Sequence, residues 1–129
     1  MVKKILLIED EEILIDLLQK RLSQEGYEVS IAKDGDEGLR IMKELNPDLI
    51  LLDIIMPKMG GFEVLEEMIK SPELKKIPVI IISNSGQPLE LERAKKLGVK
   101  DWLIKTEFNP EEVIEKIEKI VKQIENKNI

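Results

Sequence analysis

Short apolar runs alternate with longer segments of helical periodicity along the whole chain. Three of the runs, residues 5–8, 49–52 and 79–82, are apolar throughout, as strands covered on both faces of a parallel sheet must be. Residues 28–31 alternate polar and apolar positions, and residues 102–104 form a short run with charged neighbours, so both are predicted to be edge strands. The alternation predicts five strand–helix repeats built around a parallel sheet.

The segments between these runs carry apolar residues at helical spacing. The first predicted helix stops near Gly26 and has an apolar stripe expected to pack on the sheet. That stripe consists of Ile13, Leu14, Leu17, Leu18 and Leu22. Further helices are predicted over residues 34–46, 64–71, 88–98 and 109–124, and the last begins with a capping Asn109 followed by Pro110.

Five such repeats in 129 residues leave room for one domain. With right-handed crossovers they favour a flavodoxin-like (βα)5 three-layer α/β sandwich, whose five-stranded parallel sheet has the order 2-1-3-4-5. The domain is expected to cover residues 1–125, and residues 126–129 are expected to form a frayed C-terminal tail. In this topology a ligand crevice lies at the carboxyl ends of the first and third strands.

Composition narrows the classes of function. The chain has 20 Lys and Arg residues against 26 Asp and Glu, and a net charge of −6 disfavours nucleic acid and anionic membranes as partners. It contains no cysteine and no histidine, which excludes disulfides, thiol nucleophiles and imidazole bases. Only four consecutive apolar residues precede Glu9, too few for a signal peptide or a membrane span, so a cytoplasmic location is expected.

Carboxylates follow two of the predicted strands. Glu9 and Asp10 come after the first strand and Asp53 after the third, and these strands are neighbours in the predicted order. Crowded like charges need a cation among them, and hard oxygen ligands select Mg²⁺ or Mn²⁺. The expected ligands are Asp10 and Asp53 directly, Glu9 directly or through water, and a backbone carbonyl near Ile55.

The same edge of the sheet supplies groups suited to phosphoryl transfer. Asp53 can act as a nucleophile toward phosphorus. Lys105, after the fifth strand, offers a positive charge for a phosphoryl oxygen, and Ser83, ending the fourth, offers a hydroxyl donor. Taken singly, these residues would be read as helix caps, turn residues or surface charges. Their joint occurrence at four strand ends favours the chemical interpretation.

With these motifs the chain resembles, over nearly its whole length, the receiver domains of bacterial two-component response regulators. The family's acidic pair corresponds to Glu9 and Asp10, and its phosphoacceptor, in the segment Leu-Leu-Asp-x-x-Met-Pro-x-Met-x-Gly, corresponds to Asp53. Its strand-four hydroxyl and strand-five lysine correspond to Ser83 and Lys105. The resemblance implies that Asp53 takes a phosphoryl group from a sensor histidine kinase or a histidine phosphotransfer protein in a Mg²⁺-dependent step. It also implies a phosphoacceptor signalling domain rather than an enzyme.

The resemblance further implies how the signal leaves the domain. Trp102 falls where the family has an aromatic residue that turns inward on activation together with Ser83. The face formed by the fourth helix, fifth strand and fifth helix is the one the family uses to bind protein targets or a second copy. We therefore expect a stand-alone receiver, monomeric or dimerising on phosphorylation, that acts through an unknown protein target.

Several positions depart from the family pattern. Thr106 follows Lys105 where the family has a proline in a cis bond, and Asn84 follows Ser83 where the family has Ala or Gly. Ile55 and Ser85 occupy positions that tune the loss of the phosphoryl group in the family. An apolar side chain at Ile55 is expected to shield the acyl phosphate from water and slow this loss.

Two rival functions remain open at this point. A pseudo-receiver that binds partners without phosphorylation is supported by the Thr106 and Asn84 departures. A flavin- or nucleotide-dependent enzyme on the same fold would need a Gly-rich phosphate loop after the first strand, where acidic residues stand instead.

Overall fold

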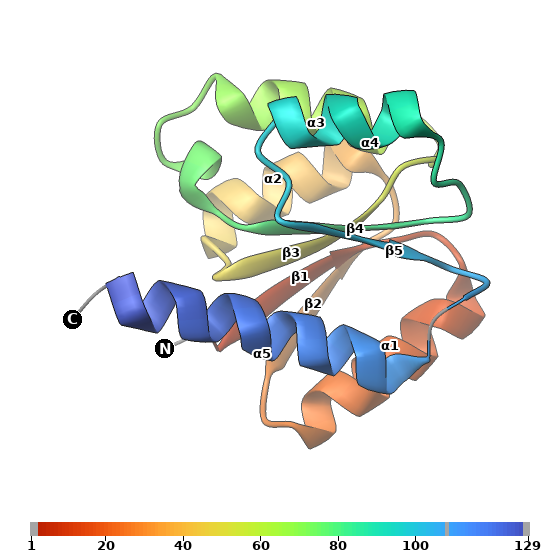
Figure 1. The fold of residues 1–129 in the computed structure, drawn as a ribbon, viewed down its shortest axis with the longest axis vertical. Coiled ribbons are helices and arrows are strands. Elements are labelled where there is room, and N and C mark those ends of the chain that lie inside the picture. The colour runs from red at the N-terminus through yellow and green to blue at the C-terminus, as the bar shows by residue number, and fades with distance from the viewer. Residues whose placement is uncertain (1–2, 108, 128–129) are drawn as a thin grey trace.

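The computed structural model describes residues 3–107 and 109–127 as a three-layer α/β sandwich (Figure 1). Five parallel strands pair in the order β2-β1-β3-β4-β5, which confirms the predicted flavodoxin-like topology and both edge strands. The strands are β1 Lys4–Ile8, β2 Glu28–Ala32, β3 Leu49–Asp53, β4 Val79–Ser83 and β5 Asp101–Ile104.

Helices cover both faces of this sheet. In Figure 1, α2, α3 and α4 lie on one side, and α1 and α5 lie on the other. Their bounds are α1 Glu12–Gln24, α2 Gly35–Leu45, α3 Gly61–Ile69, the 3-10 helix η1 Leu74–Lys76, α4 Pro88–Lys96 and α5 Pro110–Lys127.

The C-terminal boundary differs from the expected one. Helix α5 continues through Lys127 and so includes the first two residues of the segment predicted to be a tail. No proline or glycine follows Ile124 to end the helix there. Residues 128 and 129 lie outside the described residues.

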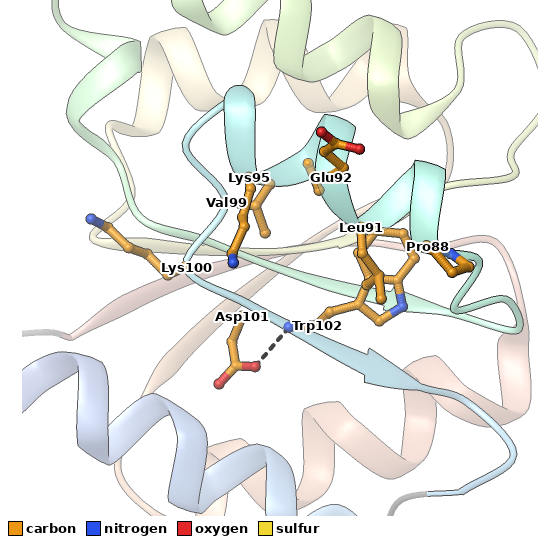
Figure 2. A pocket seen from close by; sticks show the side chains of 9 residues that line it. Pro88, Leu91, Glu92, Lys95, Val99, Lys100, Asp101 and Trp102 are labelled. Atoms are coloured by element: carbon orange, nitrogen blue, oxygen red, sulfur yellow. Dashed lines mark hydrogen bonds between the residues drawn. The ribbon is translucent and has the colours of Figure 1, made fainter.

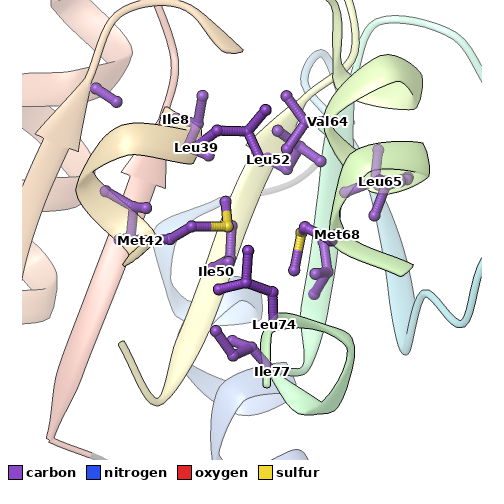
Figure 3. Close-up of a cluster of buried hydrophobic side chains, with 14 of the residues drawn as sticks. Ile8, Leu39, Met42, Ile50, Leu52, Val64, Leu65, Met68, Leu74 and Ile77 are labelled. Atoms are coloured by element: carbon purple, nitrogen blue, oxygen red, sulfur yellow. The ribbon is translucent and has the colours of Figure 1, made fainter. Parts of the chain in front are cut away.

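The alternation of side chains along β1 explains why the central strands are apolar throughout. Leu6 and Ile8 join the cluster under α2 and α3, of which Figure 3 shows a part, whereas Ile5 and Leu7 join the cluster under α1 and α5. Successive residues of a strand point to opposite faces, so both sets must be apolar when helices cover both faces. The central strands are thereby fixed in register by two cores.

The predicted stripe on α1 was partly wrong. The buried residues of α1 are Ile15, Leu18 and Leu22, whereas Ile13 is 86% exposed and Leu17 is 46% exposed. Apolar residues occupy more than one face of this helix, and periodicity alone cannot decide which face meets the sheet. Ile13 and Leu17, four residues apart, therefore form an apolar strip on the outside of the molecule.

Within the described residues, no helix combines the length and apolar character that crossing a bilayer requires.

Candidate functional site

The carboxyl ends of four strands enclose one small pocket. The register pairs Ile8 with Leu52, so Glu9 and Asp53 follow side by side, and it pairs Ser83 with Ile104, so Lys105 follows next to Ser83. The pocket measures about 210 Å³. Its lining residues are Asp10, Glu11, Asp53, Ile55, Ser83, Asn84 and Lys105.

The acidic cluster is compact. Glu9, Asp10 and Asp53 each offer a carboxylate oxygen, and these oxygens lie within 4.8 Å of one another. Glu9 and Asp53 are buried and Asp10 is exposed, so the cluster opens toward solvent on one side. Glu9 is oriented through Oε2, which accepts the backbone N–H groups of Asp10 and Glu11 at 3.0 Å each.

The other oxygen of Glu9, Oε1, forms an ion pair but no hydrogen bond within the described residues. Oε1 is buried and accepts no hydrogen bond from the part of the chain that the structure describes. Lys105 Nζ lies 2.9 Å from this atom but meets hydrogen-bond geometry only with Oε2, at 3.2 Å. Oε1 is therefore compensated by the charge of Lys105, although it takes part in no hydrogen bond within the described residues. The donor set, made of oxygens alone, fits a hard divalent ion held by Glu9, Asp10 and Asp53.

Lys105 is the central cation of the site. Its Nζ lies 3.0 Å from Asp53 Oδ2 and 2.9 Å from Glu11 Oε1. Burial acts to lower the pKa of Lys105, but hydrogen bonds with Glu9, Glu11 and Asp53 outweigh burial and raise the pKa. The peptide bonds of the described residues are all trans, including the Lys105–Thr106 bond that the sequence left open.

The pKa values of the two buried carboxyl groups, Asp53 and Glu9, are raised, whereas an ordinary ion pair lowers the pKa of a carboxyl group. Burial raises the pKa of Asp53, and it also raises the pKa of Glu9, in each case more than the hydrogen bond to Lys105 lowers it. One ammonium group cannot neutralise several carboxylates, which leaves the site with excess negative charge.

Glu11 was not singled out by sequence reasoning. In the sequence, Glu11 and Glu12 suggest only a negative charge that is favourable at a helix N-terminus. The Glu11 side chain makes no capping hydrogen bond to α1 and contacts Lys105 instead. Its place directly after the acidic pair is the only signal in the sequence.

A chain of hydrogen bonds leads from Ser83 to Trp102. Ser83 Oγ accepts the backbone N–H of Ser85 at 3.2 Å, and the Ser85 carbonyl accepts the indole N–H of Trp102 at 2.9 Å. The Ser85 hydroxyl donates to Glu90 at 2.6 Å, and Ser85 is not among the lining residues of the pocket, whereas Asn84 is. Trp102 is thereby joined to the loop that carries Ser83.

Trp102 also lines a groove between α4 and β5 (Figure 2). It measures about 540 Å³. Its lining residues are Pro88, Leu91, Glu92, Ala94, Lys95, Val99, Lys100, Asp101 and Trp102. Its lining combines apolar side chains with charged ones, and protein-binding surfaces have such a mixed composition.

The loop after Asp53 is held by the start of α3. The Gly61 N–H donates to the Ile54 carbonyl at 2.8 Å, and a Cβ atom at Gly61 would collide with the Asp53 carbonyl oxygen. The glycine therefore lets α3 approach the end of β3 closely. Ile55, in the same loop, is 75% exposed at the rim of the pocket.

Comparison with known proteins gives a consistent result. The pattern of the response regulator receiver domain matches residues 5–118. The alkaline phosphatase synthesis transcriptional regulatory protein PhoP of Bacillus subtilis is 34% identical over 123 residues, which are 95% of this chain and 50% of PhoP. The chain thus spans about half the length of that relative.

Two solved structures are similar in fold and sequence. A CheY-like response regulator receiver domain protein from Methanospirillum hungatei superposes with a TM-score of 0.89 at 28% identity, covering 98% of this chain and 99% of that chain. The Mn²⁺-bound form of response regulator Rcp1 superposes with a TM-score of 0.75 at 33% identity, covering 82% of this chain and 83% of that chain.

Proposed function

Because the chain belongs to the family of response regulator receiver domains, we propose that Asp53 accepts a phosphoryl group from the phosphohistidine of a sensor histidine kinase or phosphotransfer protein. The observation that carries the proposal is the position of the Asp53 carboxylate, buried between an acidic cluster and the Lys105 ammonium group 3.0 Å away. The domain would then be a phosphoacceptor in signalling rather than an enzyme that converts a separate substrate.

The proposed step is a displacement at phosphorus. A carboxylate oxygen of Asp53 attacks the phosphorus atom, and an O–P bond forms while the P–N bond of the donor breaks. The electron pair leaves on the donor imidazole, which regains a proton from water. With acetyl phosphate as donor, a P–O bond breaks and acetate leaves with the pair.

The other residues stabilise the transferred group. Lys105 is placed to donate an N–H to one phosphoryl oxygen, and the Ser83 hydroxyl to donate to another. A Mg²⁺ or Mn²⁺ ion held by Glu9, Asp10 and Asp53 would neutralise charge on the phosphoryl oxygens. The cluster of three carboxylates and the Mn²⁺-bound form of the related Rcp1 support such an ion. The backbone carbonyl of Ile55 stays a predicted ligand.

The output is proposed to be phosphorylation-dependent protein binding at the face formed by α4, β5 and α5. The Ser83 hydroxyl can donate to a phosphoryl oxygen, and a movement of its Oγ toward that oxygen would shift the Ser85 N–H that the Oγ now accepts. Ser85 in turn holds Trp102, which lines the groove on that face. Phosphorylation of Asp53 would therefore be transmitted through Ser83, Ser85 and Trp102 to a surface that could bind a protein target or a second copy of the chain.

Two kinds of output are compatible with this surface: binding of a separate protein by a stand-alone receiver, or action on a further domain of a longer protein. PhoP, a relative of about twice the length, is named a transcriptional regulatory protein, and a longer protein of that kind would act through a further domain. The stand-alone receiver and its cytoplasmic location stay predictions from the sequence. Either way, the receiving chemistry takes place within the residues described.

Intact-mass measurement after incubation with acetyl phosphate and Mg²⁺ tests the proposal. The parent chain is expected to gain about 80 Da, the mass of one phosphoryl group on a carboxylate nucleophile, and Asp53→Asn is expected to gain nothing. Asp36→Asn, which changes an exposed aspartate on α2, is the matched control and should label like the parent.

Each other outcome has a definite meaning. Equal labelling of Asp53→Asn would place the phosphoryl group elsewhere and overturn the assignment. A parent chain that stays unlabelled by acetyl phosphate and by a phosphohistidine donor would instead favour the pseudo-receiver.

A further inference from the structure

The Lys105 ammonium group has no hydrogen-bond donor to spare. A lysine ammonium carries three N–H donors. The Lys105 Nζ donates to Glu9 Oε2 at 3.2 Å, to Glu11 Oε1 at 2.9 Å and to Asp53 Oδ2 at 3.0 Å. A phosphoryl oxygen that binds Nζ must therefore replace one of these three carboxylates.

The three carboxylates differ in how easily they can leave. Glu9 is buried and is fixed by two backbone N–H groups. Asp53 is the residue that becomes phosphorylated and cannot move away from its own phosphoryl group. The Glu11 side chain is 55% exposed, so its carboxylate can turn into water at little cost.

We propose that Glu11 is a displaceable counterion that holds Lys105 in the unphosphorylated site and competes with the phosphoryl group for its Nζ. The inference rests on the proposed function, because it assigns a regulator of the same phosphoacceptor site. Glu11 acts through Lys105 and is a positioning residue. Its carboxylate slows entry of the phosphoryl group and returns to Nζ when that group is lost.

The contact is built into the fold rather than made by a free surface side chain. The Glu11 backbone N–H is bonded to Glu9 Oε2 at 3.0 Å, which fixes where its side chain starts. The Lys105 backbone N–H donates to the Ser83 carbonyl at 2.7 Å, which fixes the other partner. Glu11 also lines the pocket that an incoming phosphodonor must enter.

The negative charge of Glu11 should also slow phosphorylation, because it repels the phosphodonor. Glu11 adds a fourth carboxylate to the pocket region beside Glu9, Asp10 and Asp53, and phosphodonors are anions. Removing this charge lowers repulsion of the donor and weakens the contact that occupies one N–H of Lys105. Both effects accelerate phosphorylation.

Glu11→Gln is the test, with Glu12→Gln as the matched control. Glu12 is the next residue, is similarly exposed and pairs with Lys33 instead of Lys105. Both variants remove one negative charge from the same end of α1. Glu11 makes no capping hydrogen bond through its side chain, so Glu11→Gln should fold, and thermal unfolding checks this.

Two quantities are measured at saturating Mg²⁺. One is the rate constant for labelling by acetyl phosphate, and the other is the calorimetric affinity for beryllium fluoride, a tetrahedral analogue of a phosphoryl group. Glu11→Gln should raise both by roughly two- to fivefold, the range expected for breaking a half-exposed ion pair. Glu12→Gln should leave both close to the parent values.

The outcomes separate this inference from the proposed function. A parent chain that labels normally, with Glu11→Gln equal to the parent in both quantities, overturns the role of Glu11 alone. Equal increases in Glu11→Gln and Glu12→Gln also overturn it, because the effect is then one of general charge. A parent chain that binds no beryllium fluoride and stays unlabelled by acetyl phosphate and by a phosphohistidine donor overturns both.

Discussion

The Nζ atom of Lys105 lies 3.0 Å from Oδ2 of Asp53, and the Lys105 and Asp53 side chains are only 7% and 4% exposed. Burial nevertheless raises the pKa of Asp53, because loss of solvent around the carboxylate outweighs the hydrogen bond and the charge of Lys105, which lower it. The ionised Asp53 carboxylate therefore opposes folding, and a cation that neutralises it stabilises the fold.

Asp53→Asn should increase the free energy of unfolding at neutral pH. The substitution removes a buried negative charge from a site with excess carboxylates, and the expected gain is on the order of 1 kcal/mol. Urea unfolding in buffer containing a chelator measures it. The exposed control Asp36→Asn should unfold like the parent, and a loss of stability in Asp53→Asn would contradict the charge excess.

This gain should shrink as the pH falls. The pKa of Asp53 is higher in the folded chain than in the unfolded chain, so the cost of ionisation appears as pH rises through the folded value. Below the unfolded value the carboxyl is protonated in both states and costs nothing. The difference in unfolding free energy between Asp53→Asn and the parent, followed from neutral to acidic pH, should therefore approach a constant low value. A pH-independent difference would count against the raised pKa.

Mg²⁺ should stabilise the parent chain through the acidic cluster. A ligand present at a hundred times its dissociation constant adds about 2.7 kcal/mol to the free energy of unfolding when it binds only the folded state. Asp10→Asn should remove most of this gain, because Asp10 belongs to the cluster. Asp16→Asn, which changes an exposed residue of α1, should retain it. Thermal unfolding with and without Mg²⁺ measures the effect.

Ile55→Asn should shorten the lifetime of the phosphorylated chain. Ile55 lines the rim of the pocket, and a polar amide there can position the attacking water that the apolar side chain repels. The expected acceleration is on the order of tenfold, a modest share of what orienting a reactant can contribute. Decay of the mass adduct after removal of the donor gives the rate. Ile69→Asn, at a half-exposed position of α3, should decay like the parent, and an unchanged rate in Ile55→Asn would refute shielding.

Trp102→Phe should destabilise the chain through the loop after β4. The phenyl ring can keep its contact with Phe62, whose ring centroid lies 6.5 Å from that of Trp102, but it cannot donate to the Ser85 carbonyl. The expected loss is about 1 kcal/mol, typical of one hydrogen bond. Urea unfolding followed by far-ultraviolet circular dichroism measures it, since the only tryptophan is removed. An unchanged stability would show that the indole bond does not hold the loop.

The sheet and the main site residues could be predicted because their signals are local. Each strand is an apolar run, and the polar residue that ends it, such as Asp53 or Ser83, falls at a defined strand end. The topology then brings these ends together without further information. The strand order and the grouping of Glu9, Asp10 and Asp53 follow from the sequence in this way.

Two features could not be predicted because they depend on tertiary packing: the buried face of α1 and the contact between Glu11 and Lys105. The sequence places Ile13 and Ile15 on α1 with similar apolar character, and only packing against the sheet decides that Ile15 is buried. Likewise, Glu11 and Glu12 are adjacent acidic residues, but only Glu11 lies within reach of Lys105. Chemical type sets what a residue can do, and backbone direction sets which partner it meets.

Glu9, Asp53 and Lys105 follow or end β1, β3 and β5, which are spread across most of the chain. A polypeptide emerging from the ribosome with only β1 to β4 made lacks Lys105, whose ammonium group contacts Asp53 in the folded chain. Under the proposed function, competence to receive a phosphoryl group must await synthesis and docking of the edge strand β5, one of the long-range pairings that form slowly. An unfinished copy would not draw phosphoryl groups away from mature molecules.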